Sequence, residues 1–371
     1  MDSTSFSKLD LPKSYIPSDA RFTPGPSIIP ESFVEKLAKA SGRYLGTSHR
    51  KSSVINLTKE LQQGLKDYFN LPDDYLVILG NGGATCLFDS LSLNAVDKNI
   101  THYTCGEFSS KWFKASDLIP GMNAINKSVE FGQGVVFGED PDAEIICGTL
   151  NETSTGVQLS SRPNLKAGQL LAIDATSGGG QIPWDVNKTD YFFFSPQKVF
   201  ASEGGLFVMC ASPAGVEKIL KENNRYIPQF MNLKPYVENS RKHQVFTTPS
   251  LSTLFFLNEQ VKIMNGIGRS KVEQEGEEKA QILYKWAEEK DYLSCFVEEE
   301  QFRSRTVATI NVDDKLKVDP LLKFLDEENF VHGINSYRKL GKNQFRIAFF
   351  PQIKKEDVER LTHLLSFYLE S

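Results

Sequence analysis

The sequence predicts an α/β protein whose large domain contains a mostly parallel sheet covered by helices on both faces. Apolar strands alternate along the chain with amphipathic helices, which is the pattern of a parallel sheet buried on both sides. Polar residues follow several of these strands, where open α/β sheets collect ligands. At 371 residues the chain is long enough for this domain and a smaller one.

Composition excludes several other classes of protein. Hydrophobic residues make up 40% and charged residues 24% of the sequence, which is ordinary for a globular enzyme. The net charge of -5 gives no basis for binding nucleic acid or an anionic membrane. The five cysteines lack CxxC spacing, so we expect no metal site and no disulfide framework. Without an apolar leader or a long apolar run, the sequence predicts a cytoplasmic protein.

The N-terminal region predicts an arm followed by two helices. Residues 1–21 are polar and interrupted by prolines, and we expect them to form an N-terminal arm. In RFTPGPSIIPESF the prolines impose extended backbone, and Pro30 suits the first turn of a helix over 31–40 that ends near Gly42. After the polar loop GTSHRKSS, apolar residues from Val54 to Phe69 recur at helical spacing.

A strand, a glycine turn and a helix follow in YLVILGNGGATCLFDSLSLNAV. The strand covers 75–79, and the turn contains Gly80, Gly82 and Gly83. This order directs backbone N–H groups and a helix N-terminus at a phosphate group. The turn also leaves open a nucleotide-binding dehydrogenase, although LGNGGAT lacks the GxGxxG spacing and the acidic partner of the ribose.

The alternation continues to the C-terminus. We expect further strands at THYTC, EIICGT, LLAID, YFFF and GLFVMCA, helices over 109–117 and 213–222, and a loop-rich passage to Gln244. A long helix starts at TTPSLST, and the charged helical run after it bridges to a second domain. The remaining elements are a strand in RTVATINV, a helix in DPLLKFLDEENF, the strand FRIAFF and a helix over 355–369. We therefore expect a large domain over 22–265 and a small α+β domain over 266–371.

Asp174 and Lys198 stand at the ends of two of these apolar strands. A buried carboxylate near a lysine is what a pyridoxal phosphate enzyme needs. The lysine forms a Schiff base with the cofactor aldehyde, and the aspartate holds a proton on the pyridine nitrogen. Taken singly, Lys198 suits a solvated strand end and Asp174 suits a turn or a helix cap.

From about Phe22 to the C-terminus the chain resembles a divergent branch of the phosphoserine aminotransferase family of class V pyridoxal phosphate enzymes. The resemblance rests on motifs in this order: TPGPS, TSHR, LGNGGAT, GEFSSK, NETSTG, IDATSGG, SPQK, TTPS, YRKLG and FRIAFFP. It implies an aspartate-aminotransferase-like fold (fold type I) with a seven-stranded sheet in the large domain. It also implies pyridoxal 5'-phosphate as the cofactor and a homodimer with shared active sites.

The resemblance also implies roles for single residues. Lys198 and Asp174 are the catalytic pair, Phe108 lies against the pyridine face and Thr153 lies beside the phenolic oxygen. The other residues expected to bind the cofactor are Gly83, Ala84, Thr85, Gln197, Thr247 and Thr248. The best-known members carry an arginine where Thr85 stands and a histidine where Tyr337 stands, so the substrate phosphate loses two expected contacts. An ordinary packing role for Phe108 stays open.

For the substrate, the resemblance implies that Arg346 binds the α-carboxylate, since a guanidinium pairs with a carboxylate through two hydrogen bonds. His49, Arg50 and Arg338 are expected at the far anion, although the first two also suit an exposed basic pair. The implied reaction is transamination of 3-phosphohydroxypyruvate with L-glutamate, in serine biosynthesis. A related aminotransferase of the serine/alanine–glyoxylate type stays open, as does use of the phosphorylated threonine analogue of vitamin B6 synthesis.

Overall fold

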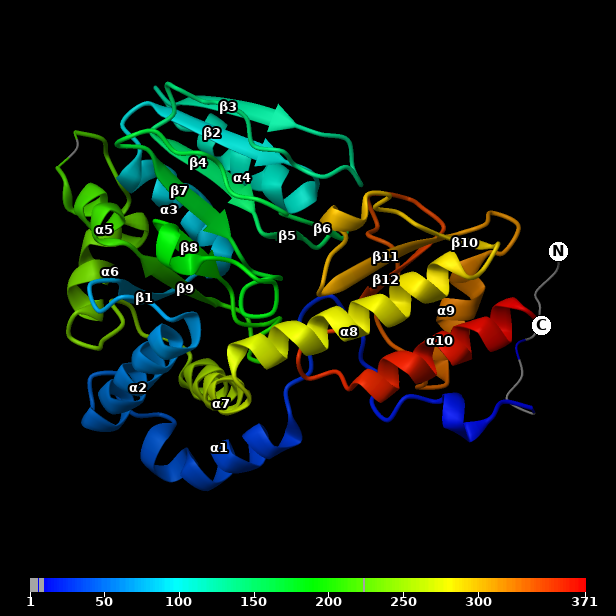
Figure 1. The fold of residues 1–371 in the computed structure, drawn as a ribbon. Helices are drawn as coiled ribbons and strands as arrows, with labels where there is room; N and C mark the ends of the chain where they lie inside the picture. Colours follow the sequence, from blue (N-terminus) through cyan, green and yellow to red (C-terminus); the bar gives the residue numbers. More distant parts are fainter. Residues whose placement is uncertain (1–5, 7–9, 223) are drawn as a thin grey trace.

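The computed structural model describes residue 6, residues 10–222 and residues 224–371. Most of the predicted arm before Asp10 lies outside the described residues. Figure 1 shows a large sheet surrounded by helices and a smaller sheet beside it, with the helix α8 (Arg269–Glu288) running from one to the other. Within the described residues, no helix is long and apolar enough to cross a membrane.

The large sheet has seven strands in the order β1-β9-β8-β7-β4-β2-β3. β9 runs antiparallel to both of its neighbours, and the other adjacent pairs are parallel, so the predicted fold class is confirmed. The strands are β1 (Leu76–Asn81), β2 (Asn99–Thr104), β3 (Asn123–Ser128), β4 (Ile145–Thr149), β7 (Leu170–Asp174), β8 (Tyr191–Phe194) and β9 (Leu206–Ala211). The sequence did not predict β3, because this edge strand is largely exposed and lacks an apolar run.

Helices cover both faces of the large sheet, which explains its continuous apolar strands. Phe192 and Phe194 of β8 join a core with α2 (Ser52–Phe69) and α7 (Leu251–Ile267). Tyr191 and Phe193 face the other way, into a second core. Its helices are α3 (Gly83–Ala95), α4 (Glu107–Asp117), α5 (Pro213–Leu220) and α6 (Leu233–Ser240).

Two helices differ in detail from the expectation. The first helix, α1 (Glu31–Tyr44), runs past Gly42, which therefore lies inside the helix rather than at its end. The passage before Gln244 contains the short helix α6, where a loop was expected. Asn232 caps α6 by accepting a hydrogen bond from Lys234 N at 3.1 Å, a start signal of the kind that Asn provides.

The smaller sheet is antiparallel and contains β10 (Leu293–Cys295), β11 (Val307–Val312) and β12 (Gln344–Ala348). It packs with α8, α9 (Val318–Glu327) and α10 (Lys355–Leu369) around a core of its own. Phe22 and Ile28 also belong to that core, so the start of the predicted large domain packs on the small one. The separate cores support our proposal of domains at 22–265 and 266–371. The segment that contains Phe22 and Ile28 precedes the large sheet in the chain but packs in the core of the smaller one.

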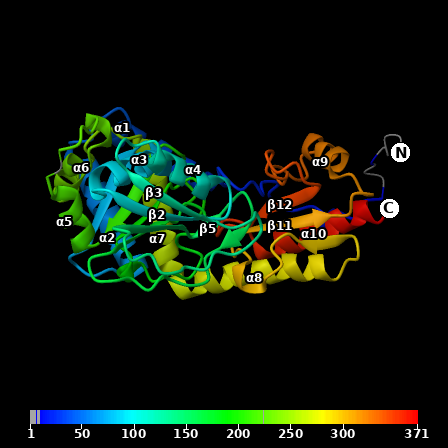
Figure 2. The ribbon, with the colours of Figure 1, turned by 90° about the horizontal axis from the view of Figure 1, so that it is seen from above.

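Short elements link the two sheets. The hairpin β5 (Asn151–Glu152) and β6 (Val157–Gln158) lies between the large sheet and the β11–β12 pair (Figure 2). Thr309 Oγ1 in β11 donates to the carbonyl oxygen of Thr155 at 2.7 Å, which ties this hairpin to the small sheet. The 3-10 helices are η1 (Lys13–Tyr15), η2 (Val186–Lys188), η3 (Gln229–Met231) and η4 (Glu300–Phe302).

Candidate active site

Lys198 and Asp174 meet in one cavity at the carboxyl ends of β7 and β8. Asp174 is the last residue of β7 and pairs in register with Phe193, and Lys198 follows β8 by four residues. Both residues are buried: Lys198 is 8% exposed and Asp174 is 3% exposed. They line a cavity of about 760 Å³, which we call the Lys198 cavity. Parallel strands thus carry two charges that are distant in sequence to the same edge of the sheet.

The amine of Lys198 has a lowered pKa because it is buried. Nζ donates a hydrogen bond to Thr153 Oγ1 at 2.9 Å. Burial lowers the pKa of Lys198 to about 8, and the nearby negative charge of Asp174 offsets part of this effect. Near neutral pH the unprotonated fraction of this amine is therefore far larger than that of an ordinary lysine, which favours a role as general base.

Asp174 is held in place by the residue that follows its strand. Its Oδ1 accepts hydrogen bonds from Thr176 N at 2.9 Å and from Thr176 Oγ1 at 2.6 Å. Burial raises the pKa of the Asp174 carboxyl, while these two hydrogen bonds and the charge of Lys198 oppose that rise. A buried cation beside it, such as a protonated pyridine nitrogen, would favour the carboxylate form.

The turn between β1 and α3 forms another wall of the cavity. Gly82 has φ 104°, in the left-handed region that glycine favours, and Gly83 begins α3. Ala84 N donates to Ser195 Oγ at 2.8 Å, and Gly83, Ala84, Thr85 and Gln197 all line the cavity. The N-terminus of α3 therefore points a partial positive charge at the cavity, as an anion site requires. Gly80 lies within β1 instead of in the turn.

Phe108 and Thr153 approach Lys198 from two further elements. Phe108 lies in the first turn of α4, and the Lys198 Nζ is 5.2 Å from the centroid of its ring. Thr153 follows β5, and its hydroxyl donates to Ser177 Oγ at 2.8 Å while it accepts from Lys198. Both residues line the cavity at the place where the sequence predicts a ring-binding surface.

Arg346 enters the cavity from the smaller sheet. It lies on β12, and its Nη1 donates to the carbonyl oxygen of Thr153 at 3.4 Å. The guanidinium carbon is 5.3 Å from the centroid of the Tyr337 ring. Its Nε is buried and has no hydrogen-bond partner in the described part of the chain. A buried N–H donor without a partner is costly, which favours an anionic ligand at this point.

Five of the predicted residues lie outside the Lys198 cavity of this chain. They are His49, Arg50, Thr247, Thr248 and Arg338. Arg50, Thr248 and Arg338 are exposed. Thr247 and Thr248 accept hydrogen bonds from Asn81 Nδ2, through the Thr247 hydroxyl at 3.0 Å and the Thr248 carbonyl at 2.8 Å. The Lys198 cavity of one chain therefore contains Arg346 but none of these five residues.

The TPGPS segment holds the backbone at Gln197 and Lys198, a role that the sequence did not predict. Ser27 N donates to the carbonyl oxygen of Gln197 at 2.7 Å, and Ser27 Oγ donates to the carbonyl oxygen of Lys198 at 2.6 Å. A Cβ on Gly25 would lie 2.8 Å from Lys198 Cε, so glycine is needed for this approach. The close-set prolines were the available signal, since they fix an extended segment that can reach this far.

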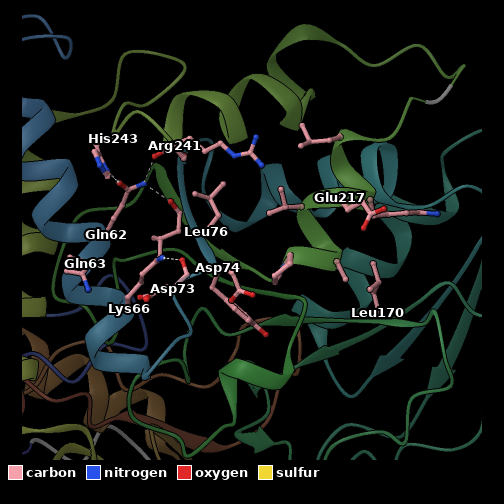
Figure 3. Close-up of a pocket in the computed structure, with 18 of the residues that line it drawn as sticks. Gln62, Gln63, Lys66, Asp73, Asp74, Leu76, Leu170, Glu217, Arg241 and His243 are labelled. Atoms are coloured by element: carbon pink, nitrogen blue, oxygen red, sulfur yellow. Dashed lines mark hydrogen bonds between the residues drawn. The ribbon is translucent and has the colours of Figure 1, made fainter.

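A second, larger cavity of about 1020 Å³ lies at the opposite ends of the strands. Figure 3 shows it lined by Leu76 and Leu170, the first residues of β1 and β7, and by Lys66 and His243 on the side away from Leu170. His243 Nδ1 is 2.7 Å from Gln62 Oε1, and Lys66 Nζ donates to the carbonyl oxygen of Asp73 at 2.7 Å. These polar groups are used within the protein, and the smaller Lys198 cavity is the better candidate for chemistry.

Comparisons with known proteins identify the family of the chain. Residues 139–361 match the family model of the class-V aminotransferases. The chain is 40% identical over 365 residues to a phosphoserine aminotransferase of Corynebacterium glutamicum (strain R), covering 97% of each chain. A solved phosphoserine aminotransferase from Cytophaga hutchinsonii aligns with a TM-score of 0.85 and 27% identity, covering 94% of this chain and 98% of that one. A phosphoserine aminotransferase with bound pyridoxal phosphate, from Trichomonas vaginalis, shares the fold with a TM-score of 0.82 and 19% identity, covering 93% and 99%.

Proposed function

The chain belongs to the phosphoserine aminotransferases, within the class-V aminotransferases, and we propose that it transfers the amino group of L-glutamate to 3-phosphohydroxypyruvate. The products are O-phospho-L-serine and 2-oxoglutarate. The protein is a transaminase that depends on pyridoxal 5'-phosphate. The observation that carries the proposal is the buried Lys198 amine, which shares one cavity with Asp174 and with the unpartnered Nε of Arg346.

The residues around Lys198 fit pyridoxal phosphate. The N-terminus of α3, with Gly83, Ala84 and Thr85, would hold the phosphate together with Gln197. The Phe108 ring would lie against one face of the pyridine ring, and the Thr153 hydroxyl would bind the phenolic oxygen. Asp174 would accept a hydrogen bond from the protonated pyridine nitrogen at the buried end of the cavity.

Each residue then has a stated task in amino transfer. When bound, pyridoxal phosphate supplies the electron sink that stabilises negative charge on the substrate α-carbon. Lys198 Nζ would accept the proton of that carbon and later return one, which its pKa of about 8 permits. Asp174 would keep the pyridine nitrogen protonated. Arg346 would bind the α-carboxylate of both substrates and orient the C–H bond toward Lys198.

We also propose a homodimer in which the partner completes the substrate site. Within one chain, Arg346 and Lys111 are the cationic side chains other than Lys198 that line the described Lys198 cavity. Each substrate, however, carries a second anionic group. His49 and Arg50 lie in the loop between α1 and α2, outside that cavity, so a second copy is their route to this group. Arg338 would join them, and Thr247 and Thr248 would reach the partner's cofactor phosphate.

We further propose that the enzyme is cytoplasmic. The described chain contains Cys86, Cys105, Cys147, Cys210 and Cys295, and all five are free thiols. Four of them are buried. Unpaired cysteines fit a reducing compartment.

A coupled assay tests the proposed reaction on protein whose visible absorption shows bound cofactor. We expect glutamate alone to give at most one 2-oxoglutarate per active site, and continued formation of 2-oxoglutarate only when 3-phosphohydroxypyruvate is present to take up the amino group. Alanine or serine with glyoxylate is the matched alternative, and faster turnover of that pair would replace the proposed substrates. The phosphorylated threonine analogue belongs in the same assay, run in reverse with 2-oxoglutarate. Protein without visible cofactor absorption after incubation with pyridoxal phosphate would contradict the enzyme class itself.

A further inference from the structure

Glu152 is a fully buried acidic residue that the proposed mechanism does not use. It is 0% exposed and lies on β5, directly before Thr153. Its two carboxylate oxygens accept hydrogen bonds from five donors on two segments. The donors are Phe108 N at 3.1 Å, Ser109 N at 2.9 Å, Ser109 Oγ at 2.9 Å, Ser154 N at 3.3 Å and Ser154 Oγ at 2.7 Å. Such a set fixes the carboxylate in one place.

These hydrogen bonds replace the missing cap of α4. The residue before this helix is Gly106, which has no side chain to bind the first N–H groups. Glu152 accepts from the N–H groups of Phe108 and Ser109, and Ser154 Oγ accepts from Glu107 N at 3.0 Å. The first three N–H groups of α4 are therefore bound by a turn that lies more than 40 residues further along the chain.

Position 106 must be a glycine because there is no room for a side chain there. Its φ of 173° is extended backbone that any residue adopts. A Cβ at this position, however, would lie 2.3 Å from Glu152 Cγ and 2.7 Å from Glu152 Cδ. The carboxylate occupies the space where a capping side chain of α4 would begin, and the GEFSSK and NETSTG motifs are thus parts of one structure.

The same carboxylate is connected to two sides of the Lys198 cavity. Glu152 accepts a hydrogen bond from Phe108 N, and the centroid of the Phe108 ring is 5.2 Å from Lys198 Nζ. Thr153, the next residue in the chain, accepts a hydrogen bond from Lys198 Nζ at 2.9 Å. The negative charge of Glu152 also acts on Lys198, whose pKa it raises against the effect of burial.

We propose that Glu152 is a positioning residue for the transamination: its carboxylate holds the start of α4 and the Thr153 turn, so that the Phe108 ring and the Thr153 hydroxyl face the cofactor. The inference rests on the proposed function, since it assumes pyridoxal phosphate between these two groups. Glu152 itself is held among backbone and serine donors, away from the reacting atoms.

The test is Glu152→Gln, which keeps the size of the side chain but turns one acceptor oxygen into an NH2 group facing N–H donors. We expect the visible circular dichroism of the bound cofactor to change, because the ring loses its fixed neighbour. We expect kcat to fall on the order of 100-fold, since a displacement of about 1 Å at a reacting centre has that effect. KM for glutamate should change less than kcat, because Arg346 is carried by β12 and contacts this turn only through one hydrogen bond of 3.4 Å to the Thr153 carbonyl oxygen.

Glu144→Gln is the matched control. Glu144 also accepts hydrogen bonds from three backbone N–H groups, those of Asp97 at 2.9 Å, Lys98 at 2.7 Å and Asn99 at 3.0 Å. It directly precedes β4, binds the residues at the start of β2 and does not line the Lys198 cavity. It should lower thermal stability without changing the cofactor spectrum or kcat. An unchanged spectrum and an unchanged kcat in Glu152→Gln would overturn the proposal, as would loss of stability alone.

Ser154→Ala keeps the proposal testable if Glu152→Gln does not fold. It removes the hydroxyl that joins Glu107 N to Glu152, and we expect a smaller change of the same spectrum in the same direction. No spectral change in Ser154→Ala would then count against the proposal. Because circular dichroism needs bound cofactor and no turnover, this result stands even if the substrates differ from those proposed.

Discussion

Two buried lysines, one in each half of the molecule, look alike by burial and charge but have different surroundings. Lys198 of the large domain is 8% exposed and Lys279 of α8 is 3% exposed. Burial lowers the pKa of each to about 8. Lys198 faces a hydroxyl, a carboxylate and an open cavity. Lys279 Nζ donates to the carbonyl oxygens of Phe350 at 2.9 Å and Ile353 at 3.1 Å.

This difference shows that a lowered pKa does not identify a reactive lysine by itself. Two carbonyl oxygens can only accept, so they use the N–H groups of Lys279 and tie α8 to the segment after β12. Lys198 Nζ instead donates to one side chain, the Thr153 hydroxyl, whose own hydrogen is donated to Ser177 Oγ. Asp174 and the cavity then supply a charge partner and room for a ligand. Geometry around the amine, together with its pKa, separates chemistry from structure.

Replacing each lysine should separate their roles most strongly. In Lys198→Ala we expect loss of the visible absorption of covalently bound cofactor and a fall in turnover of at least about 1000-fold, because the attachment point and the proton carrier are one amine. Lys279→Met should keep the spectrum and the turnover within about threefold, since surface and structural changes away from a site leave it intact. Retained turnover in Lys198→Ala, measured in the coupled assay, would contradict the assignment of Lys198.

The role of Asp174 can be tested by comparison with Asp190, another hydrogen-bonded carboxylate of the same sheet. Asp174→Asn should lower kcat on the order of 100-fold or more, because a neutral amide cannot keep the pyridine nitrogen protonated. Asp190 is the control. It accepts hydrogen bonds from Leu171 N at 2.9 Å and Ser212 Oγ at 2.6 Å at the opposite end of β7 and β8. Asp190→Asn should lower thermal stability and leave kcat unchanged. Equal kcat in both variants would show that another group serves the nitrogen.

The sequence was sufficient for those parts that local patterns determine. Continuous apolar runs such as YFFF predicted buried strands, and the order of strands and helices predicted a mostly parallel sheet. Because such a sheet brings strand ends together, Asp174 and Lys198 could be paired before any coordinates were known. The cofactor and the family followed from this pair and the ordered motifs, and both are confirmed.

Long-range contacts account for most of what the sequence did not predict. Nothing local marks Glu152 as the cap of a helix that starts 45 positions earlier, since capping rules describe neighbours in the chain. The packing of Phe22 on the small domain likewise depends on the folded backbone, where Ala348 N donates to the carbonyl oxygen of Phe22 at 3.0 Å. β3 lacked an apolar signal because it is an exposed edge strand.

Arg346 is the third charge near Lys198, and its test addresses substrate binding. Arg346→Lys should raise KM for both substrates roughly tenfold, with a smaller effect on kcat, because a point charge cannot form two parallel hydrogen bonds to a carboxylate. Arg303→Lys serves as the control. Arg303 Nη1 pairs with Glu288 Oε1 at 2.5 Å, outside the cavity. An unchanged KM for glutamate and 3-phosphohydroxypyruvate in Arg346→Lys would mean that another cation binds the α-carboxylate.

The smallest expected effect is the pH dependence of stability that Lys279 contributes. Its pKa in the folded protein is about 8, below the ordinary 10.5 of an unfolded chain. Between these two values the unfolded chain binds more protons, so the free energy of unfolding should rise with pH from about 8 to about 10.5. Below about pH 8 both states carry the proton, and the contribution is constant.

Lys279→Met removes this pH-dependent contribution to stability. It also leaves the carbonyl oxygens of Phe350 and Ile353 without the donor that Lys279 provides. We therefore expect the difference in the free energy of unfolding between parent and variant to grow by about 1–3 kcal/mol, in favour of the parent, as the pH rises from about 8 to about 10.5. Denaturant unfolding at several pH values, on cofactor-loaded protein, measures it. Lys198 is the same in parent and variant, so its own titration cancels from the difference. A difference between parent and variant that stays constant over this pH range would show that Lys279 keeps its ordinary pKa in the fold.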